Sequence, residues 1–77
     1  MALKWVKIEQ AKETKGESEW TLTLEEKRAS WEWRVDRLRG EKLETRRGWD
    51  RNYEDAKKAM LAYYERAWRL ALALEAA

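Results

Sequence analysis

The sequence predicts an α+β domain in which an antiparallel β-meander of three to four strands is followed by one long C-terminal α-helix. Two segments alternate strictly between apolar and polar residues, which is typical of strands, and isolated glycines lie between the predicted strands. The last third of the chain has the apolar repeat of an amphipathic helix. With 77 residues, the chain is expected to form a single domain, 1–77.

The first predicted hairpin turns at Gly16. The alternating segment 20–24 follows this glycine, and its residues Trp20, Leu22 and Leu24 share one parity. We therefore expect these three side chains to face the core. The strand before the glycine is indicated by an apolar-rich run that contains Leu3, Trp5, Val6 and Ile8.

The second predicted hairpin turns at Gly40. Before it, a clean alternation predicts a third strand whose inward residues are Trp31, Trp33 and Val35. After it, a fourth strand is expected from about Leu43 to Trp49. If Gly40 is the centre of the turn, the opposed pairs are Trp31 with Trp49, Trp33 with Arg47 and Val35 with Thr45. This register leaves a mixed-charge outer face made of Glu32, Arg34, Asp36, Glu44 and Arg46.

The helix is expected to run from Tyr53 to about Glu75, with Asn52 as its N-cap. Glu54 and Asp55 fall in the first turn, where the helix dipole favours negative charge. One stripe at helical spacing is expected to cover the sheet, and its members are Ala56, Ala59, Met60, Tyr63, Ala67, Leu70, Ala71 and Leu74.

The composition excludes several classes of function. The chain has no cysteine and no histidine, which excludes disulfides, thiolate chemistry, the usual zinc sites and imidazole catalysis. We therefore expect no enzymatic activity, no cofactor and no metal site. No segment approaches the roughly 20 apolar residues that a bilayer requires, and a hydrophobic signal region is absent. A cytoplasmic protein that does not bind membranes is expected.

The basic residues concentrate in the middle of the chain, where residues 28–51 hold eight basic and five acidic groups. We expect a protein partner to bind the outer face of the third and fourth strands and their turn, through charge-assisted contacts to carboxylates or phosphates. The residues assigned to this contact are Arg34, Arg37, Arg39, Arg46 and Arg47. The alternative for each of them is a solvated arginine in a weak surface ion pair.

Nucleic-acid binding is a second hypothesis for the same region. Platforms for single-stranded nucleic acid use arginine to contact phosphates and aromatic rings to stack on bases. In the predicted register, however, the tryptophans lie on the inward parity and the arginines mostly on the outward one. Acidic neighbours also weaken the positive field, so a protein partner is favoured.

A second apolar strip lies on the C-terminal half of the helix and contains Leu61, Tyr64, Trp68 and Leu72. The helix is about 34 Å long and a seven-residue strand about 23 Å, so the last turns are expected to extend beyond the sheet. We expect a homodimer through this strip, because monomers seldom expose such concentrated apolar patches. The alternative is that the strip packs under the edge of the meander or against Trp5.

The order of these motifs also resembles that of small bacterial and phage proteins built as three or four strands followed by one helix. The resemblance rests on Trp31, Trp33 and Val35 before a glycine turn, a strand ending in Gly48 and Trp49, and a helix opened by 52–56. Some proteins of that kind, including certain phage anti-CRISPR proteins, are stoichiometric inhibitors that cover a functional surface of a host protein. The resemblance implies such a role here and assigns no site residues.

A designed α+β scaffold without natural function is a further alternative, since the chain lacks proline, cysteine and histidine and has a long capped helix. Six tryptophans and an apolar C-terminal surface argue against design. The favoured prediction is a non-enzymatic inhibitor or adaptor that binds a protein partner and acts as a homodimer.

Overall fold

The computed structural model describes residues 8–76. It contains strands β1 (Ile8–Lys15), β2 (Ser18–Glu26), β3 (Trp31–Arg39) and β4 (Lys42–Asp50), followed by helix α1 (Tyr53–Ala76). The strands form one antiparallel sheet in the order β1-β2-β3-β4. The predicted meander with a C-terminal helix is therefore confirmed. Of the apolar run expected in the first strand, only Ile8 belongs to the described residues.

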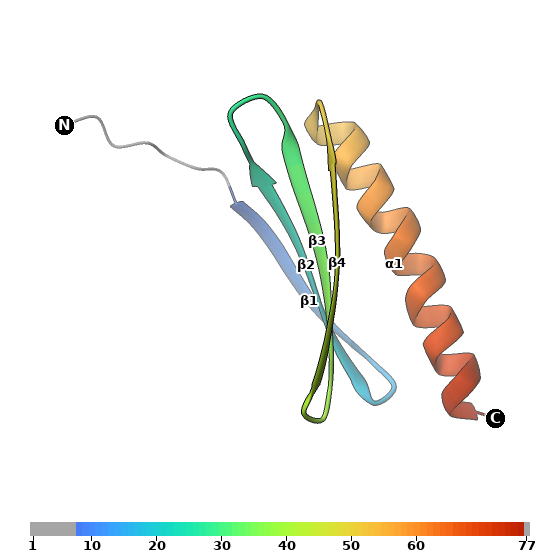
Figure 1. Ribbon diagram of the computed structural model, residues 1–77. Helices are drawn as coiled ribbons and strands as arrows, with labels where there is room; N and C mark the ends of the chain where they lie inside the picture. Colours follow the sequence, from blue (N-terminus) through green and yellow to red (C-terminus); the bar gives the residue numbers. More distant parts are fainter. Residues whose placement is uncertain (1–7, 77) are drawn as a thin grey trace.

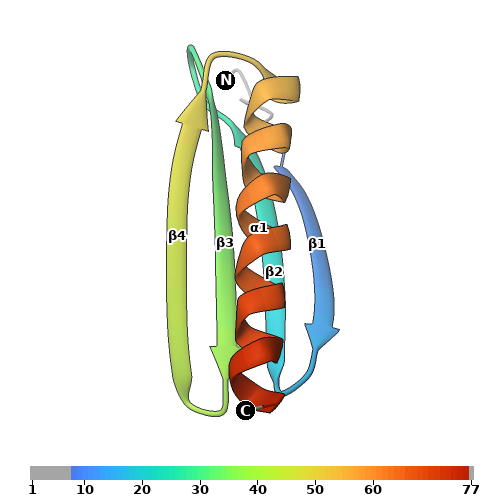
Figure 2. The same cartoon turned by 90° about the vertical axis from the view of Figure 1, so that its right-hand side faces the viewer.

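The molecule has two layers. Helix α1 lies lengthwise along one side of the sheet, over β2 and β3, with β1 and β4 on either side of it (Figures 1 and 2). We call this side of the sheet the helix-facing side and the opposite side the outer face. No element among residues 8–76 covers the outer face (Figure 1).

The core lies between α1 and the two central strands. Its residues from the sheet are Trp20, Leu22, Leu24, Trp33 and Val35. Its residues from the helix are Ala56, Met60, Tyr64 and Ala71. The rings of Trp20 and Tyr64 meet edge to face, with 5.5 Å between centroids, a geometry that aromatic pairs favour. The inward parity predicted for both central strands is confirmed.

The hairpins β1–β2 and β3–β4 both turn through two residues, of which the first is glycine. Gly16 and Gly40 each have a φ of 59°, and the structure has no positive φ at a described non-glycine residue. This combination fits the type II′ turn, which takes glycine at its first central position and matches the twist of the flanking strands.

The predicted register of β3 against β4 is wrong by one residue. Trp33 pairs with Gly48 instead of Arg47, because the loop consists of Gly40 and Glu41 rather than being centred on Gly40. The indole of Trp33 lies over Gly48, in the space that a side chain at position 48 would occupy. Only glycine fits there, so this contact and the two-residue loop require the same alignment.

A slip of one residue moves every side chain of a strand to the other face. Glu44 and Arg46 consequently lie on the helix-facing side, not on the outer face as predicted. Trp49, which the predicted register placed on the helix-facing side, lies on the outer face. The residues of β4 on the outer face are Leu43, Thr45, Arg47 and Trp49.

Helix α1 begins as predicted. The backbone amide of Asp55 donates to Oδ1 of Asn52 at 2.9 Å, so Asn52 is the N-cap. The amide of Ala56 donates to the Asn52 carbonyl at 3.1 Å, which is the first bond of the helix. The helix ends one residue after the predicted position.

The predicted core-facing stripe of the helix is correct except at its C-terminal end. Leu70 and Leu74 were expected to cover the sheet, but they are 63% and 68% exposed. The helix is rotated so that Tyr64 points into the core. The end of the β3–β4 hairpin also curves away from the last turns of α1, so nothing described there covers these leucines (Figure 1).

Candidate functional site

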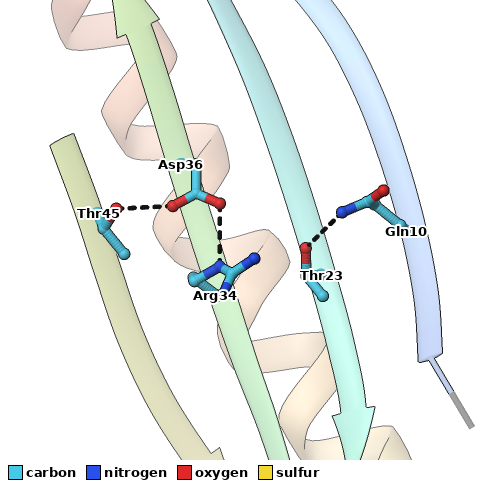
Figure 3. A network of polar contacts seen from close by, with 5 residues as sticks. All are labelled: Gln10, Thr23, Arg34, Asp36 and Thr45. Carbon is cyan, nitrogen blue, oxygen red and sulfur yellow. Dashed lines mark hydrogen bonds and ion pairs between the residues drawn. The ribbon is translucent and has the colours of Figure 1, made fainter. Parts of the chain in front are cut away.

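The outer face is the side of the sheet that no described element covers (Figure 1). Its centre is polar and ordered by side-chain hydrogen bonds (Figure 3). Asp36 accepts a bond from Nε of Arg34 at 3.0 Å and a second from the Thr45 hydroxyl at 2.7 Å. Nearby, Nε2 of Gln10 donates to the Thr23 hydroxyl at 3.2 Å. The bonds made by Thr45 and Gln10 link neighbouring strands, and the bond to Asp36, within β3, holds Arg34 in one position.

The outer face is hollowed across β1 to β4. The hollow has a volume of about 440 Å³. Its lining residues are Lys12, Glu19, Thr21, Arg34, Asp36, Leu38, Leu43, Thr45 and Arg47. Within the described chain, the charges of Lys12, Glu19 and Arg47 have no ion-pair partner. The hollow therefore offers unpaired charges of both signs around a fixed Arg34–Asp36 pair.

A second hollow, of about 620 Å³, lies beside the end of β4. It is lined by Ala29, Ser30, Glu32, Arg47, Gly48 and Trp49. Trp49 is 68% exposed, which makes it the most exposed tryptophan among residues 8–76. Arg47 lines both hollows, so the two form one continuous surface.

The five arginines assigned to partner binding do not share one face. Arg34 and Arg47 are cross-strand neighbours on the outer face, where the predicted register placed Arg34 but not Arg47, which it set opposite the inward Trp33. Arg37, Arg39 and Arg46 lie on the helix-facing side. The five therefore cannot bind one flat partner surface together.

The three arginines on the helix-facing side have partners within the chain. Nε of Arg37 donates to the buried Ser18 hydroxyl at 2.9 Å, and its guanidinium lies 5.5 Å from the ring centroid of Trp20. The other two arginines each contact one partner. Arg39 forms an ion pair with Glu17 at 3.1 Å, and the guanidinium of Arg46 lies 5.8 Å from the ring centroid of Tyr63. Arg37 thus acts in the packing of β2 against β3.

The apolar strip assigned to a dimer interface is mostly covered by the chain itself. Tyr64 is 4% exposed and belongs to the core. Trp68 is half-buried against that core, and the Lys15 ammonium lies 4.5 Å from its ring centroid. Leu72 is half-buried near Gly16. Only Leu61 is exposed, so the strip is largely the inner side of the helix, as in the alternative in which it packs under the meander.

Two tyrosines of α1 hold β1 in place. The Tyr53 hydroxyl donates to Glu9 at 2.5 Å and the Tyr64 hydroxyl to Glu13 at 2.7 Å. The hydrogen bond from Tyr53 lowers the pKa of Glu9, and the bond from Tyr64 lowers the pKa of Glu13. Burial and the bond to Glu13 raise the pKa of the Tyr64 hydroxyl.

Sequence reasoning missed Trp49 and Leu43 as outer-face residues because it used the wrong register. Two signals pointed to the correct one. A glycine followed by a non-glycine between two strands suits a two-residue type II′ loop at Gly40 and Glu41. Gly48 lies in a strand that pairs with the strand containing Trp31 and Trp33. A glycine inside a strand is typical of a position where a neighbouring side chain approaches the backbone.

Within residues 8–76 the structure shows no cluster of three acidic side chains arranged to hold a metal ion. The described helix is not long and apolar enough to cross a membrane. A scan against protein-family models finds no match, and searches of curated proteins and of solved structures find none either. The interpretation of the outer face therefore rests on its own geometry and charge.

Proposed function

We propose that this chain is a non-enzymatic inhibitor or adaptor that binds another protein through the outer face of its sheet. The observation that carries the proposal is the hollow of about 440 Å³ with unpaired Lys12, Glu19 and Arg47 at its wall. Charged groups of both signs, fixed beside apolar side chains, offer a protein partner both ion pairs and apolar contacts.

The residue types of the outer face support a protein interface. Arginine and tryptophan are enriched among the residues that dominate binding energy, and the surface offers Arg47 and Trp49 two positions apart on the same face of β4. Leu38 and Leu43 face each other across β3 and β4 at the other end. Exposed apolar groups at both ends and polar groups between them suit a partner with a matching mixed surface.

The charge balance favours protein over nucleic acid. The strand residues of the outer face include three basic side chains, Lys12, Arg34 and Arg47. They also include four acidic ones, Glu19, Glu25, Glu32 and Asp36. A surface without net positive charge gives little of the counterion-release free energy that drives binding to phosphate backbones.

The test is capture of a partner from a lysate of the source cell by tagged wild-type chain and two variants. Thr21→Arg places a long side chain inside the hollow, whereas Ala62→Arg places the same side chain on an exposed position of α1. We expect a defined protein to be retained by the wild type and by Ala62→Arg, and lost from Thr21→Arg. Equal retention by all three chains would contradict the outer face as the binding surface.

Nucleic-acid binding is a second candidate because Trp49 shares the outer face with Arg47 and Arg34. An aromatic ring and arginines on one exposed face are the combination that base-stacking platforms use. The same capture experiment separates the two functions when it is repeated with nuclease and at high salt. Retention that disappears under both treatments would assign the outer face to nucleic acid.

A further inference from the structure

Strand β4 is a free edge of the sheet along its whole length. In a hairpin with a two-residue loop, the residues flanking the loop form a hydrogen-bonded pair, and such pairs alternate along the ladder. Lys42 flanks the loop, so the even-numbered residues of β4 bond to β3. The backbone amides and carbonyls of Leu43, Thr45, Arg47 and Trp49 consequently point toward the free edge.

The sequence of β4 is complementary to itself when it is reversed. Lys42 and Asp50 stand at its two ends, with opposite charges, and neither has an ion-pair partner within residues 8–76. Next inside them are Leu43 and Trp49, which lie on the outer face and are 64% and 68% exposed. The two terminal charges and the two exposed apolar side chains thus each have their complement at the opposite end of the same strand.

We propose that two copies of this chain pair antiparallel along β4, with Arg46 on the two-fold axis, and form one continuous eight-stranded sheet. Leu43 then lies opposite the partner's Trp49, and Lys42 lies opposite the partner's Asp50, each contact occurring twice. The backbone amides and carbonyls that point toward the edge then form hydrogen bonds between the two copies, because Leu43 opposes the partner's Trp49 and Thr45 opposes the partner's Arg47. A free edge is otherwise prone to unspecific pairing, and here its backbone groups gain hydrogen-bond partners along the nine-residue strand.

The one directly opposed like-charge pair in this arrangement is formed by the two copies of Arg46, and the two copies of Arg47 are diagonal neighbours on the outer face. In the chain the guanidinium of Arg46 is directed over the ring of Tyr63, 5.8 Å from the centroid, on the helix-facing side. This stacking draws the charge toward α1 and away from the axis. Two pairs of Lys42 with the partner's Asp50 oppose the remaining repulsion.

The other free edge, β1, has no comparable self-complementarity. Its only large apolar residue within the described chain is Ile8, so a reversed copy supplies no apolar partner at the far end. The proposal concerns β4 alone and does not rest on the proposed binding of another protein. It adds one consequence for the outer face, because the pairing joins the outer faces of the two copies into a single surface.

The first test uses proline, which removes a backbone donor. Arg47→Pro removes an amide that points toward the free edge of β4 and leaves the bonds to β3 in place. Lys12→Pro is the matched control, because Lys12 is also unpaired, basic and edge-pointing, but on β1. Light scattering over a dilution series should give twice the chain mass of 9.3 kDa for the wild type and for Lys12→Pro. Arg47→Pro should halve the mass while circular dichroism stays unchanged.

A monomeric wild type at the highest concentration would overturn the proposal. A dimer that survives Arg47→Pro, or that is lost equally in Lys12→Pro, would also overturn it.

The second test checks the register between the two copies by disulfide cross-linking. Single cysteines can be introduced for it because the chain has none of its own. On the axis, the two copies of residue 46 form a pair without hydrogen bonds, with α-carbons about 4.5 Å apart, which is within reach of a disulfide. The two copies of residue 45 lie diagonally, about 7–8 Å apart, beyond that reach. Arg46→Cys should therefore form a covalent dimer under mild oxidation, and Thr45→Cys should not. Faster cross-linking of Thr45→Cys would contradict the proposed register.

Discussion

The indole of Trp33 lies over Gly48 on the neighbouring strand, in the space that a β-carbon at position 48 would occupy. This relationship aligns β4 with β3 and so decides which side chains reach the outer face. It also packs the ring of Trp33 beneath that of Tyr63, at 5.9 Å between centroids. One glycine therefore serves both the core and the surface proposed here for binding.

Gly48→Ala should destabilise the fold by about 1–3 kcal/mol, because the new methyl group must displace the buried indole. The measurement is the free energy of unfolding from urea titration followed by circular dichroism. Gly40→Ala is the comparison, since no atom beyond the neighbouring residues lies within 4 Å of the position its β-carbon would take, and its cost comes from the positive φ alone. Gly40→Ala should keep the stacking of Trp33, whereas Gly48→Ala should disturb it in the near-ultraviolet spectrum. An unchanged stability of Gly48→Ala would contradict the described contact.

The stability of the fold should fall in acid as the tyrosine–glutamate bonds to β1 are lost. The pKa of Glu9 and that of Glu13 are lower in the folded chain than in the unfolded chain. The unfolded chain thus binds these protons more tightly, so the contribution is present above the unfolded pKa of about 4.3 and is lost as pH falls through the folded values. The urea midpoint should therefore decrease below about pH 4.3.

A double variant, Tyr53→Phe with Tyr64→Phe, tests this assignment because it keeps the rings and removes both hydroxyls. Its urea midpoint should depend less on pH between neutral and acid conditions than that of the wild type. Tyr63→Phe is the control, since the Tyr63 hydroxyl has no side-chain hydrogen bond within residues 8–76. If the double variant and the wild type lose stability in parallel, the acid transition arises elsewhere in the chain.

Trp68 and Leu70 should respond oppositely to truncation. Trp68 packs on the core, so Trp68→Ala should cost about 2 kcal/mol of unfolding free energy, less than a fully buried tryptophan costs. Leu70 is 63% exposed, so Leu70→Ala should change stability by less than about 0.5 kcal/mol. Urea titration of both variants checks the rotation of α1 on the sheet. A larger loss for Leu70→Ala would favour the stripe first inferred from helical spacing.

Much of the fold follows from local patterns. The alternation at Trp20, Leu22 and Leu24 and at Trp33 and Val35 predicts inward faces that the structure confirms. Asn52 ends the loop before α1 because its side chain satisfies a free amide of the first turn, which is a local interaction. Such elements depend on residues a few positions apart in the chain.

The residues of the candidate surface were predicted less well, because the face that each occupies depends on the alignment of β4 with β3. The predicted register placed Arg34 on the outer face correctly, but it set Arg46 outward and Arg47 inward, and the structure shows the reverse. Arg37 and Arg39, also assigned to partner binding at the outer face, lie on the helix-facing side. A prediction of which face a strand residue occupies fails completely if the alignment with the neighbouring strand shifts by one position. Trp49 and Leu43 were hidden by that shift.

The sequence by itself determined the order of the elements, the turns at glycine, the helix cap and the inward residues of β2 and β3, because each depends on periodicity or on contacts within one element. Only the tertiary structure decided the register of β4, the rotation of α1 and hence the composition of the outer face. These depend on how Trp33 meets Gly48 and how Tyr64 meets Trp20, contacts between residues distant in sequence. Side-chain shape across strands and layers, not the pattern within a segment, sets them.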